Sequence, residues 1–147
     1  MNMNLRRATA DDKPEWLRMR ILLWPEAGPA DLSNEMEQML PDALTPVFVL
    51  ERPEGGLGGF LEAGTRKFAE GCTTTPVGYI EGWFVDEDLR GRGFGHQLVR
   101  AAEDWARSQG LKEVGSDTWL DNEGSIRAHL AMGYHETERV VNFAKTL

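Results

Sequence analysis

The chain has 147 residues, of which 41% are hydrophobic and five are Trp, a composition typical of one globular domain rather than of a disordered or fibrous protein. Its 24 acidic and 16 basic residues give a formal net charge of -8, which opposes binding to nucleic acid or to an anionic membrane. The charge favours cationic partners, although acids that only keep the surface solvated would give the same value.

The cysteine content and the hydropathy pattern narrow the class further. Cys72 is the only cysteine, which excludes an internal disulfide and a cysteine-based zinc cluster. No segment approaches the roughly 20 apolar residues of a membrane span, and no apolar run follows the basic pair near the amino terminus. We therefore expect a single domain over residues 1–147, without a metal, in the cytoplasm.

The amino-terminal third predicts a strand followed by two helices. Residues 5–8 can form the strand, and Thr9 with Asp12 makes a capping box for a helix that Pro25 ends. The expected apolar face of this helix contains Leu17, Ile21 and Trp24. A second helix, ended by Pro41, has an expected apolar face of Leu32, Met36, Met39 and Leu40.

The middle of the chain predicts a hairpin and then a core strand. Residues 47–50 and 57–63 read as two strands joined by a turn at 52–56, and a long polar loop follows over 65–76. Residues 78–85 form the next strand, which is rich in aromatic and β-branched residues. Glu81 interrupts that strand and Gly82 follows it, which indicates a bulge or a close approach by another group.

The sequence RGRGFG at 90–95 comes directly after this strand and opens an apolar-periodic helix that ends near Gly110. Glycines at such a junction let backbone N–H groups approach an anion, and the helix N-terminus and two arginines add positive charge. The loop therefore predicts a phosphate site, with a glycine-rich turn and solvated arginines as the alternative. It is neither the dinucleotide fingerprint nor a P-loop, because the third glycine and the Gly-Lys-Ser/Thr ending are missing.

The last part of the chain predicts a strand, a helix and a final strand. Residues 111–118 contain a strand that Asp117 closes, and Asp121 or Asn122 can cap the helix that follows. Residues 137–144 read as the last strand. The order of strands and helices predicts the α/β class, with a mixed sheet flanked by helices.

That order, together with two motifs, resembles the GNAT acetyltransferase superfamily. Its coenzyme loop has the pattern Arg/Gln-x-x-Gly-x-Gly/Ala, which Arg90, Gly93 and Gly95 fit. A second block, N-x-x-A-I-x(6)-G-F, is matched by Asn122, Ser125, Ile126, Gly133 and Tyr134, with Ser125 in place of the small residue and Tyr134 in place of the aromatic one. The resemblance implies the GNAT fold, with a mixed central sheet of about six to seven strands and about four helices.

The resemblance also implies acetyl-CoA as co-substrate and assigns residues to it. Phe84 and Val85 would pair with the pantetheine arm, and Asn122 would belong to the coenzyme site. The pyrophosphate would lie on the loop formed by Arg90, Gly91, Arg92, Gly93, Phe94 and Gly95. His129 occupies the helix position where many members carry the tyrosine that protonates the departing thiolate, and imidazole could donate that proton. A histidine packed on the apolar face of its helix is the equal alternative.

Within the superfamily the chain looks most like the aminoglycoside 6'-N-acetyltransferases. The features that match are the Leu-Trp-Pro segment around Trp24, the tract from Gly71 to Gly82, and Ser116-Asp117-Thr118. This resemblance implies resistance enzymes that acetylate the 6'-amino group of a polycationic antibiotic, and a homodimer. It places Trp24, Glu81 and Asp117 at the acceptor, with Glu81 as a catalytic residue.

The residues support the acceptor site independently. An ionised acid within a core strand, as at Glu81, or closing one, as at Asp117, is costly unless it is paired or faces a cleft. Carboxylates in a cleft could bind an ammonium group and accept or relay its proton. The alternative for each acid is a structural pair with a nearby Arg or Lys. Acetylation of another amine, such as a polyamine or a protein N-terminus, and non-catalytic sensing of acetyl-CoA remain alternatives for the whole chain.

Overall fold

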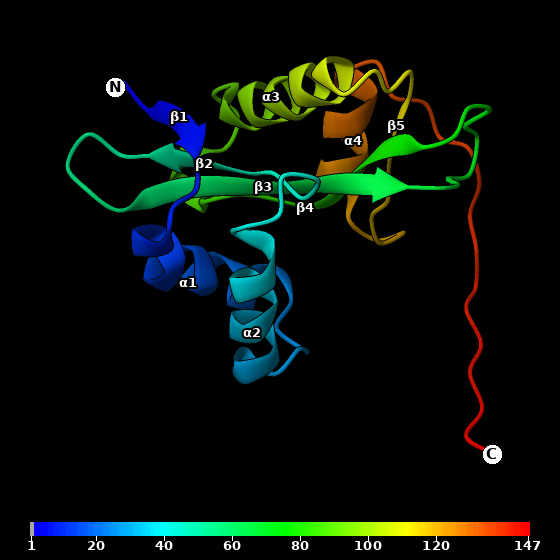
Figure 1. The fold of residues 1–147 in the computed structure, drawn as a ribbon, viewed down its shortest axis with the longest axis horizontal. Helices are drawn as coiled ribbons and strands as arrows, with labels where there is room; N and C mark the ends of the chain where they lie inside the picture. The colour runs from blue at the N-terminus through cyan, green and yellow to red at the C-terminus, as the bar shows by residue number, and fades with distance from the viewer. Residues whose placement is uncertain (1) are drawn as a thin grey trace.

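The computed structural model describes residues 2–147 and contains a five-stranded sheet with helices on both faces (Figure 1). The strands are β1 (Asn4–Arg7), β2 (Val47–Glu51), β3 (Leu57–Arg66), β4 (Val77–Val85) and β5 (Val114–Ser116). The helices are α1 (Lys13–Leu23), α2 (Pro29–Met39), α3 (Phe94–Ser108) and α4 (Glu123–Ala131), with short 3-10 turns at Ala10–Asp12 and Glu87–Leu89. The α/β class predicted from the sequence is confirmed.

The five strands follow one another across the sheet in chain order. The pairs from β1 to β4 are antiparallel, whereas β4 and β5 are parallel. The parallel pairing covers only three residue pairs, from Gly78 opposite Val114 to Ile80 opposite Ser116. Because β4 continues to Val85, its last five residues have no strand beside them on the β5 side.

The sheet separates two hydrophobic clusters. On one face α3 packs Leu98, Val99 and Ala102 against β2, β3 and β4, and α4 lies beside α3 near β5. On the other face α1 and α2 bury Trp16, Met19 and Met36. Leu32 and Met36 are buried as predicted for the second helix.

The predicted apolar face of α1 is wrong in detail. Trp16, Met19 and Arg20 form its buried face, while Ile21 is 36% exposed and Leu17 is only half-buried. The cause is Arg20, a charged residue on the inner face, which breaks the apolar period that the sequence would otherwise show. Its guanidinium is buried because it is paired with a carboxylate of β3.

The predicted last strand does not form within the chain. Residues 135–147, which we call the C-terminal arm, have no helix or strand and run away from the sheet (Figure 1). Val140, Val141 and Phe143 on the arm are exposed, the last of them by 92%. A strand needs an edge to pair with, and the arm meets none in the single chain. The sheet therefore has five strands, fewer than the about six to seven expected.

Candidate functional site

A β-bulge places Glu81 on the middle of β4. Ala63 pairs with Ile80 and Glu62 pairs with Gly82, so Glu81 is an extra residue with no partner on β3. The bulge that the sequence indicated at this point is confirmed, and it turns the carboxylate outward, where 39% of the side chain is exposed.

Gly82 also allows the close approach that the sequence indicated. A Cβ atom at this position would lie 2.6 Å from Cη2 of Trp24, so the indole of Trp24 rests directly on the strand backbone. Trp24 follows the last turn of α1, and its ring is tilted against Phe60 of β3. The structure thus brings Trp24 and Glu81 together, as the sequence predicted for the acceptor.

Trp24 and Glu81 line a pocket of about 440 Å³ between α1, α2 and the sheet, a volume within the usual range for small-molecule sites. Four of its lining residues are glutamates, namely Glu26, Glu35, Glu62 and Glu81. Trp119, which is 76% exposed, lines the pocket beside them. We call this the acidic pocket. Its carboxylates and indoles suit a cation with apolar ring faces.

Glu62 closes the acidic pocket and was not predicted from the sequence. Its carboxylate accepts hydrogen bonds from Nε and Nη2 of Arg20 at 2.7 and 3.0 Å, and from the indole N–H of Trp16 at 2.8 Å. Only 3% of Glu62 is exposed, and its carboxylate is fully paired, so Glu62 has a structural role in the wall of the pocket. The available signal was the same as for Glu81, an acid within an apolar strand.

Glu81 is paired with Arg66 at the end of β3. Nη2 of Arg66 lies 2.5 and 3.2 Å from the two carboxylate oxygens, so the structural alternative considered for Glu81 is present in the chain. The guanidinium of Arg66 also stacks 3.5 Å above the ring of Tyr79. Arg66 and Tyr79 were not predicted as site residues, because Arg66 belongs to no motif and Tyr79 reads as part of the apolar content of its strand.

Asp117 lies outside the lining of the acidic pocket but is linked to it by Tyr79. The Tyr79 hydroxyl donates a 2.6 Å hydrogen bond to Oδ2 of Asp117. Burial, followed by this hydrogen bond to Asp117, raises the pKa of Tyr79 above its ordinary value, which keeps the phenol protonated and donating. Asp117, Tyr79, Arg66 and Glu81 thus form one chain of contacts across β3, β4 and the end of β5.

His129 lies on α4 with a partner at each ring nitrogen. Nδ1 is 2.7 Å from the Ser125 carbonyl, which only accepts, so Nδ1 carries a proton. Nε2 is 2.7 Å from Oγ of Ser116, and the ring meets Trp83 edge-on. The sequence left open whether His129 packs or donates a proton. In the structure the ring packs against Trp83 and is also hydrogen-bonded to Ser116, which lies between Nε2 and the end of the β4–β5 pairing.

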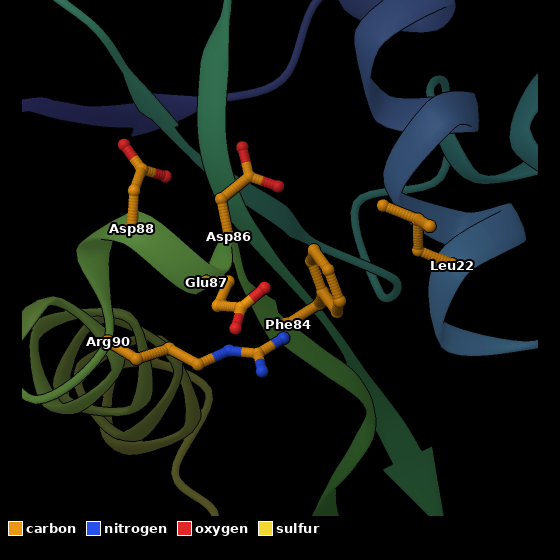
Figure 2. Close-up of a pocket in the computed structure, with 6 residues that line it drawn as sticks. All are labelled: Leu22, Phe84, Asp86, Glu87, Asp88 and Arg90. Atoms are coloured by element: carbon orange, nitrogen blue, oxygen red, sulfur yellow. The ribbon is translucent and has the colours of Figure 1, made fainter.

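A second pocket, of about 670 Å³, lies at the other end of the open β4 edge. Figure 2 shows its lining: Leu22 of α1, Phe84 of β4, the acids of the following turn, and Arg90. Asp86 in this turn accepts hydrogen bonds from Arg18 at 2.9 Å and from Arg52 at 3.0 Å. These contacts hold the turn in place and so position the glycine loop that follows it.

The glycine loop opens α3 with free space above its backbone. Gly91 and Gly93 have φ angles of +75° and +85°, and a Cβ atom on either would meet nothing within 4 Å. The φ angles favour glycine, and the open space leaves room for a group bound against the backbone. Gly95 is required for a different reason, because a Cβ there would lie 3.1 Å from the Trp83 ring. Arg92 is exposed beside the loop, and Phe94 is half-buried.

The backbone of Val85 faces the open edge of β4. Phe84 pairs with Phe60, and the Asp86 N–H donates to the Gly58 carbonyl, so the alternation of an antiparallel ladder leaves Val85 pointing away from β3. Its carbonyl accepts a 2.8 Å hydrogen bond from Nε of Arg90. Phe84 contributes its ring to the pocket, while Val85 contributes backbone groups.

Asn122 has a local role at the start of α4. Its side-chain oxygen accepts a 3.1 Å hydrogen bond from the Ser125 N–H, which is the N-cap predicted from the sequence. Oδ1 of Asn122 is therefore already hydrogen-bonded within α4.

The comparisons with known proteins agree with this geometry. Residues 14–134 match the model of the acetyltransferase (GNAT) family. The chain belongs to that family. Among the described residues of this GNAT chain no helix is long and apolar enough to cross a membrane. Nor do three or more His, Cys, Asp or Glu side chains gather to hold a metal ion in residues 2–147.

Several relatives of this GNAT chain share a name. An aminoglycoside N(6')-acetyltransferase type 1 from Stenotrophomonas maltophilia is 38% identical over 144 residues, which is 97% of this chain and 93% of the relative. A protein of the same name from Klebsiella aerogenes is 38% identical over 97% of this chain and 96% of its own.

Solved structures are similar over the whole chain. AAC(6')-Iy in complex with the bisubstrate analogue CoA-S-monomethyl-acetylneamine has a TM-score of 0.92 and 31% identity, covering 100% of both chains. The aminoglycoside 6'-N-acetyltransferase AAC(6')-Ih from Acinetobacter baumannii has a TM-score of 0.90 and 35% identity, covering 99% of both.

Proposed function

We propose that this protein is a resistance enzyme that transfers the acetyl group of acetyl-CoA to the 6'-amino group of aminoglycosides. The observation that carries this proposal is the position of the acidic pocket on the unpaired stretch of β4, which leads through one short turn into the glycine loop. A polycationic acceptor and an anionic coenzyme can thus meet along one strand. The names of relatives that are 38% identical over nearly the full chain support the choice of acceptor.

The residues present fit acetyl-CoA. The open backbone at Gly91 and Gly93, the first turn of α3 and the exposed Arg92 would hold the pyrophosphate. The outward backbone of Val85 would hold the pantetheine arm, once its carbonyl is released by Arg90. Phe84 and Phe94 add apolar surface on either side. When bound, acetyl-CoA supplies an activated acyl thioester.

Acetyl transfer to an ammonium group removes two protons from the nitrogen and supplies one to the departing sulfur. Glu81 accepts the proton of the acceptor ammonium, directly or through a water, so that the neutral amine can form the new N–C bond. The C–S bond then breaks, and the nitrogen gives up its second proton to solvent. The thiolate takes a proton from the Ser116 hydroxyl, which regains one from His129 Nε2 when both ring nitrogens carry a proton, and the imidazole is reprotonated by solvent. Asp117, which the Tyr79 hydroxyl holds in place, binds another positive group of the acceptor.

An acceptor panel tests the function. The protein is incubated with acetyl-CoA and kanamycin, tobramycin, spermidine or a peptide, and release of free thiol is followed. We expect turnover with the two aminoglycosides and little with the others. Turnover with spermidine or the peptide alone would make the protein an acetyltransferase of another amine. Tight coenzyme binding without turnover on any amine would make it a sensor.

The enzyme acts as a homodimer in the cytoplasm. The C-terminal arm exposes Val140, Val141 and Phe143, a combination that costs free energy unless a partner covers it. The outer edge of β5 is the matching surface, because β5 pairs only with β4 on its inner side. The arm of one copy can add a strand there on the other copy, and exchange of identical elements is a common route to dimers. A free Cys72 is compatible with the reducing cytoplasm.

A further inference from the structure

Two arginines pair with glutamates near the acidic pocket, and they differ in how firmly they are held. Arg20 is 3% exposed and donates to Glu62, Glu35 and the Leu32 carbonyl. Arg66 is 43% exposed, and within residues 2–147 its side chain donates hydrogen bonds to Glu81 alone, which is 39% exposed. A buried pair with several partners is costly to break, whereas a half-exposed pair is exchanged easily.

Arg66 has a second contact that does not depend on Glu81. Its guanidinium stacks 3.5 Å above the Tyr79 ring, and the Tyr79 hydroxyl is bonded to Asp117. A cation over a tyrosine face is stabilised even when its carboxylate partner is lost. When Arg66 releases Glu81, its guanidinium therefore still has the Tyr79 ring as a partner. Glu81 is then free to bind another cation.

We propose that Arg66 is a resident counter-ion of Glu81 that the acceptor ammonium must displace, and that this competition selects polycationic acceptors over monoamines. The inference rests on the proposed function and names the residue that sets its acceptor class. A monoamine only replaces one cation by another at Glu81. An acceptor with several ammonium groups gains further contacts with Glu26 and with Glu35, which is 58% exposed and has only one carboxylate oxygen bonded to Arg20, and so displaces Arg66 more readily.

The test compares two acceptors on three proteins. Kanamycin serves as the polycation and 6-amino-6-deoxyglucose as the monoamine, with the wild-type chain, Arg66→Gln and Arg66→Lys. We expect Arg66→Gln to lower KM for the monoamine by about fivefold, which an ion pair of this exposure can support, and to change KM for kanamycin less. Arg66→Lys keeps the charge and should restore the wild-type preference.

A matched control and a second readout decide between explanations. Arg107 forms an exposed pair with Asp104 on α3, so Arg107→Gln makes the same change in net charge away from the pocket and should leave both KM values unchanged. Equal losses of kcat/KM for both acceptors in Arg66→Gln would mean that Arg66 only holds Glu81 in position, and an unchanged preference would mean that it is only structural. Either result overturns the proposal.

The proposed function and this inference can fail separately. If the wild-type chain releases no thiol with kanamycin, the function is wrong. Calorimetric titration of both amines into the complex with coenzyme A then still measures whether Arg66→Gln tightens the monoamine selectively. If the wild-type chain turns over kanamycin but the variants keep its preference, only the role of Arg66 is wrong.

Discussion

Ile80 of β4 lies opposite Ser116 of β5 in the last parallel residue pair, and the two strands do not pair beyond it. Glu81 is the next residue on β4, and Ser116 holds the hydrogen bond to His129. The proposed proton acceptor, Glu81, and the proposed proton donor, Ser116, thus lie at the point where β4 and β5 stop pairing. Ligands of open α/β sheets bind at such points, beyond the carboxyl ends of diverging strands.

The glycine loop gives a prediction on coenzyme binding. Gly93→Ala adds a methyl group to the open face where the pyrophosphate would lie, and we expect at least a tenfold weaker affinity for coenzyme A by calorimetric titration. Gly110→Ala is the matched control, because Gly110 has a similar φ of +76° and open space at the far end of α3. Both variants should lose about 1 kcal/mol or more of stability from backbone strain. Equal coenzyme affinities in the two variants would remove the loop from the site.

Glu81 predicts an effect on the chemical step. Glu81→Gln keeps the size of the side chain but cannot accept a proton, so kcat and kcat/KM should fall together by about 10² to 10⁴. Glu51→Gln is the control, because Glu51 is also a strand acid paired with an arginine and is 42% exposed. Wild-type kcat in Glu81→Gln would make Glu81 an anchor or a structural partner.

Asp117 predicts a different kinetic pattern. Asp117→Asn removes a charge while its side-chain oxygen can still accept the Tyr79 hydroxyl, so the contact chain is kept. We expect a higher KM for kanamycin with little change in kcat, since an anchor binds ground state and transition state alike. Steady-state kinetics at fixed acetyl-CoA measure both values. A fall in kcat at unchanged KM would place Asp117 in the chemical step instead.

Asp12 predicts a pH dependence of stability. The Arg6 guanidinium holds the pKa of this carboxyl below its ordinary value, and the Thr9 N–H adds to the effect. A lowered pKa in the folded state stabilises the fold above the unfolded value of about 3.9, and this contribution is lost as the pH falls through the folded value.

The measurement for Asp12 is urea unfolding of the wild-type chain and Asp12→Asn between pH 7 and pH 3. The variant should be less stable by about 1 to 2 kcal/mol at pH 7, since it loses an ion pair and a capping interaction. The difference should shrink toward pH 3, as the wild-type carboxyl takes up its proton. A difference that stays constant over this range would contradict the role assigned to Arg6.

The C-terminal arm predicts the assembly. Sedimentation should show a dimer for the full chain and a monomer after deletion of residues 137–147 or for Val141→Lys with Phe143→Lys, because the change removes the apolar contact of the added strand. Deletion of residues 145–147 alone is the control and should leave the dimer. A full chain that is monomeric at micromolar concentration, with its arm intact, would contradict the proposal.

The parts of the fold that the sequence predicts are those decided by local geometry. The Glu81-Gly82 pair marks a bulge because an acid and a missing side chain both disturb a strand locally. Gly91 and Gly93 mark a loop that opens a helix because their backbone angles favour glycine. Asn122 predicts the start of α4 for the same kind of reason.

The remaining contacts depend on residues that are distant in the chain. Arg66 meets Glu81, 15 residues away, only because β3 and β4 pair in one particular register. Arg20 meets Glu62 across 42 residues, and that pair allows a charged residue to lie on the buried face of α1. The sequence of the arm alternates like a strand, but only a neighbouring edge could make it one. No local pattern contains this information.

The length of β4 sets the distance between the proposed acceptor site and the proposed coenzyme site. From Glu81 to Val85 the chain advances four residues, or about 13 Å in an extended strand. One inserted or deleted residue would change this spacing and exchange the faces of every later side chain. The acidic pocket, in contrast, takes most of its lining from α1, α2 and the segment that joins them. Substitutions in that region can therefore alter the choice of the proposed acceptor while the spacing to the proposed coenzyme site stays fixed.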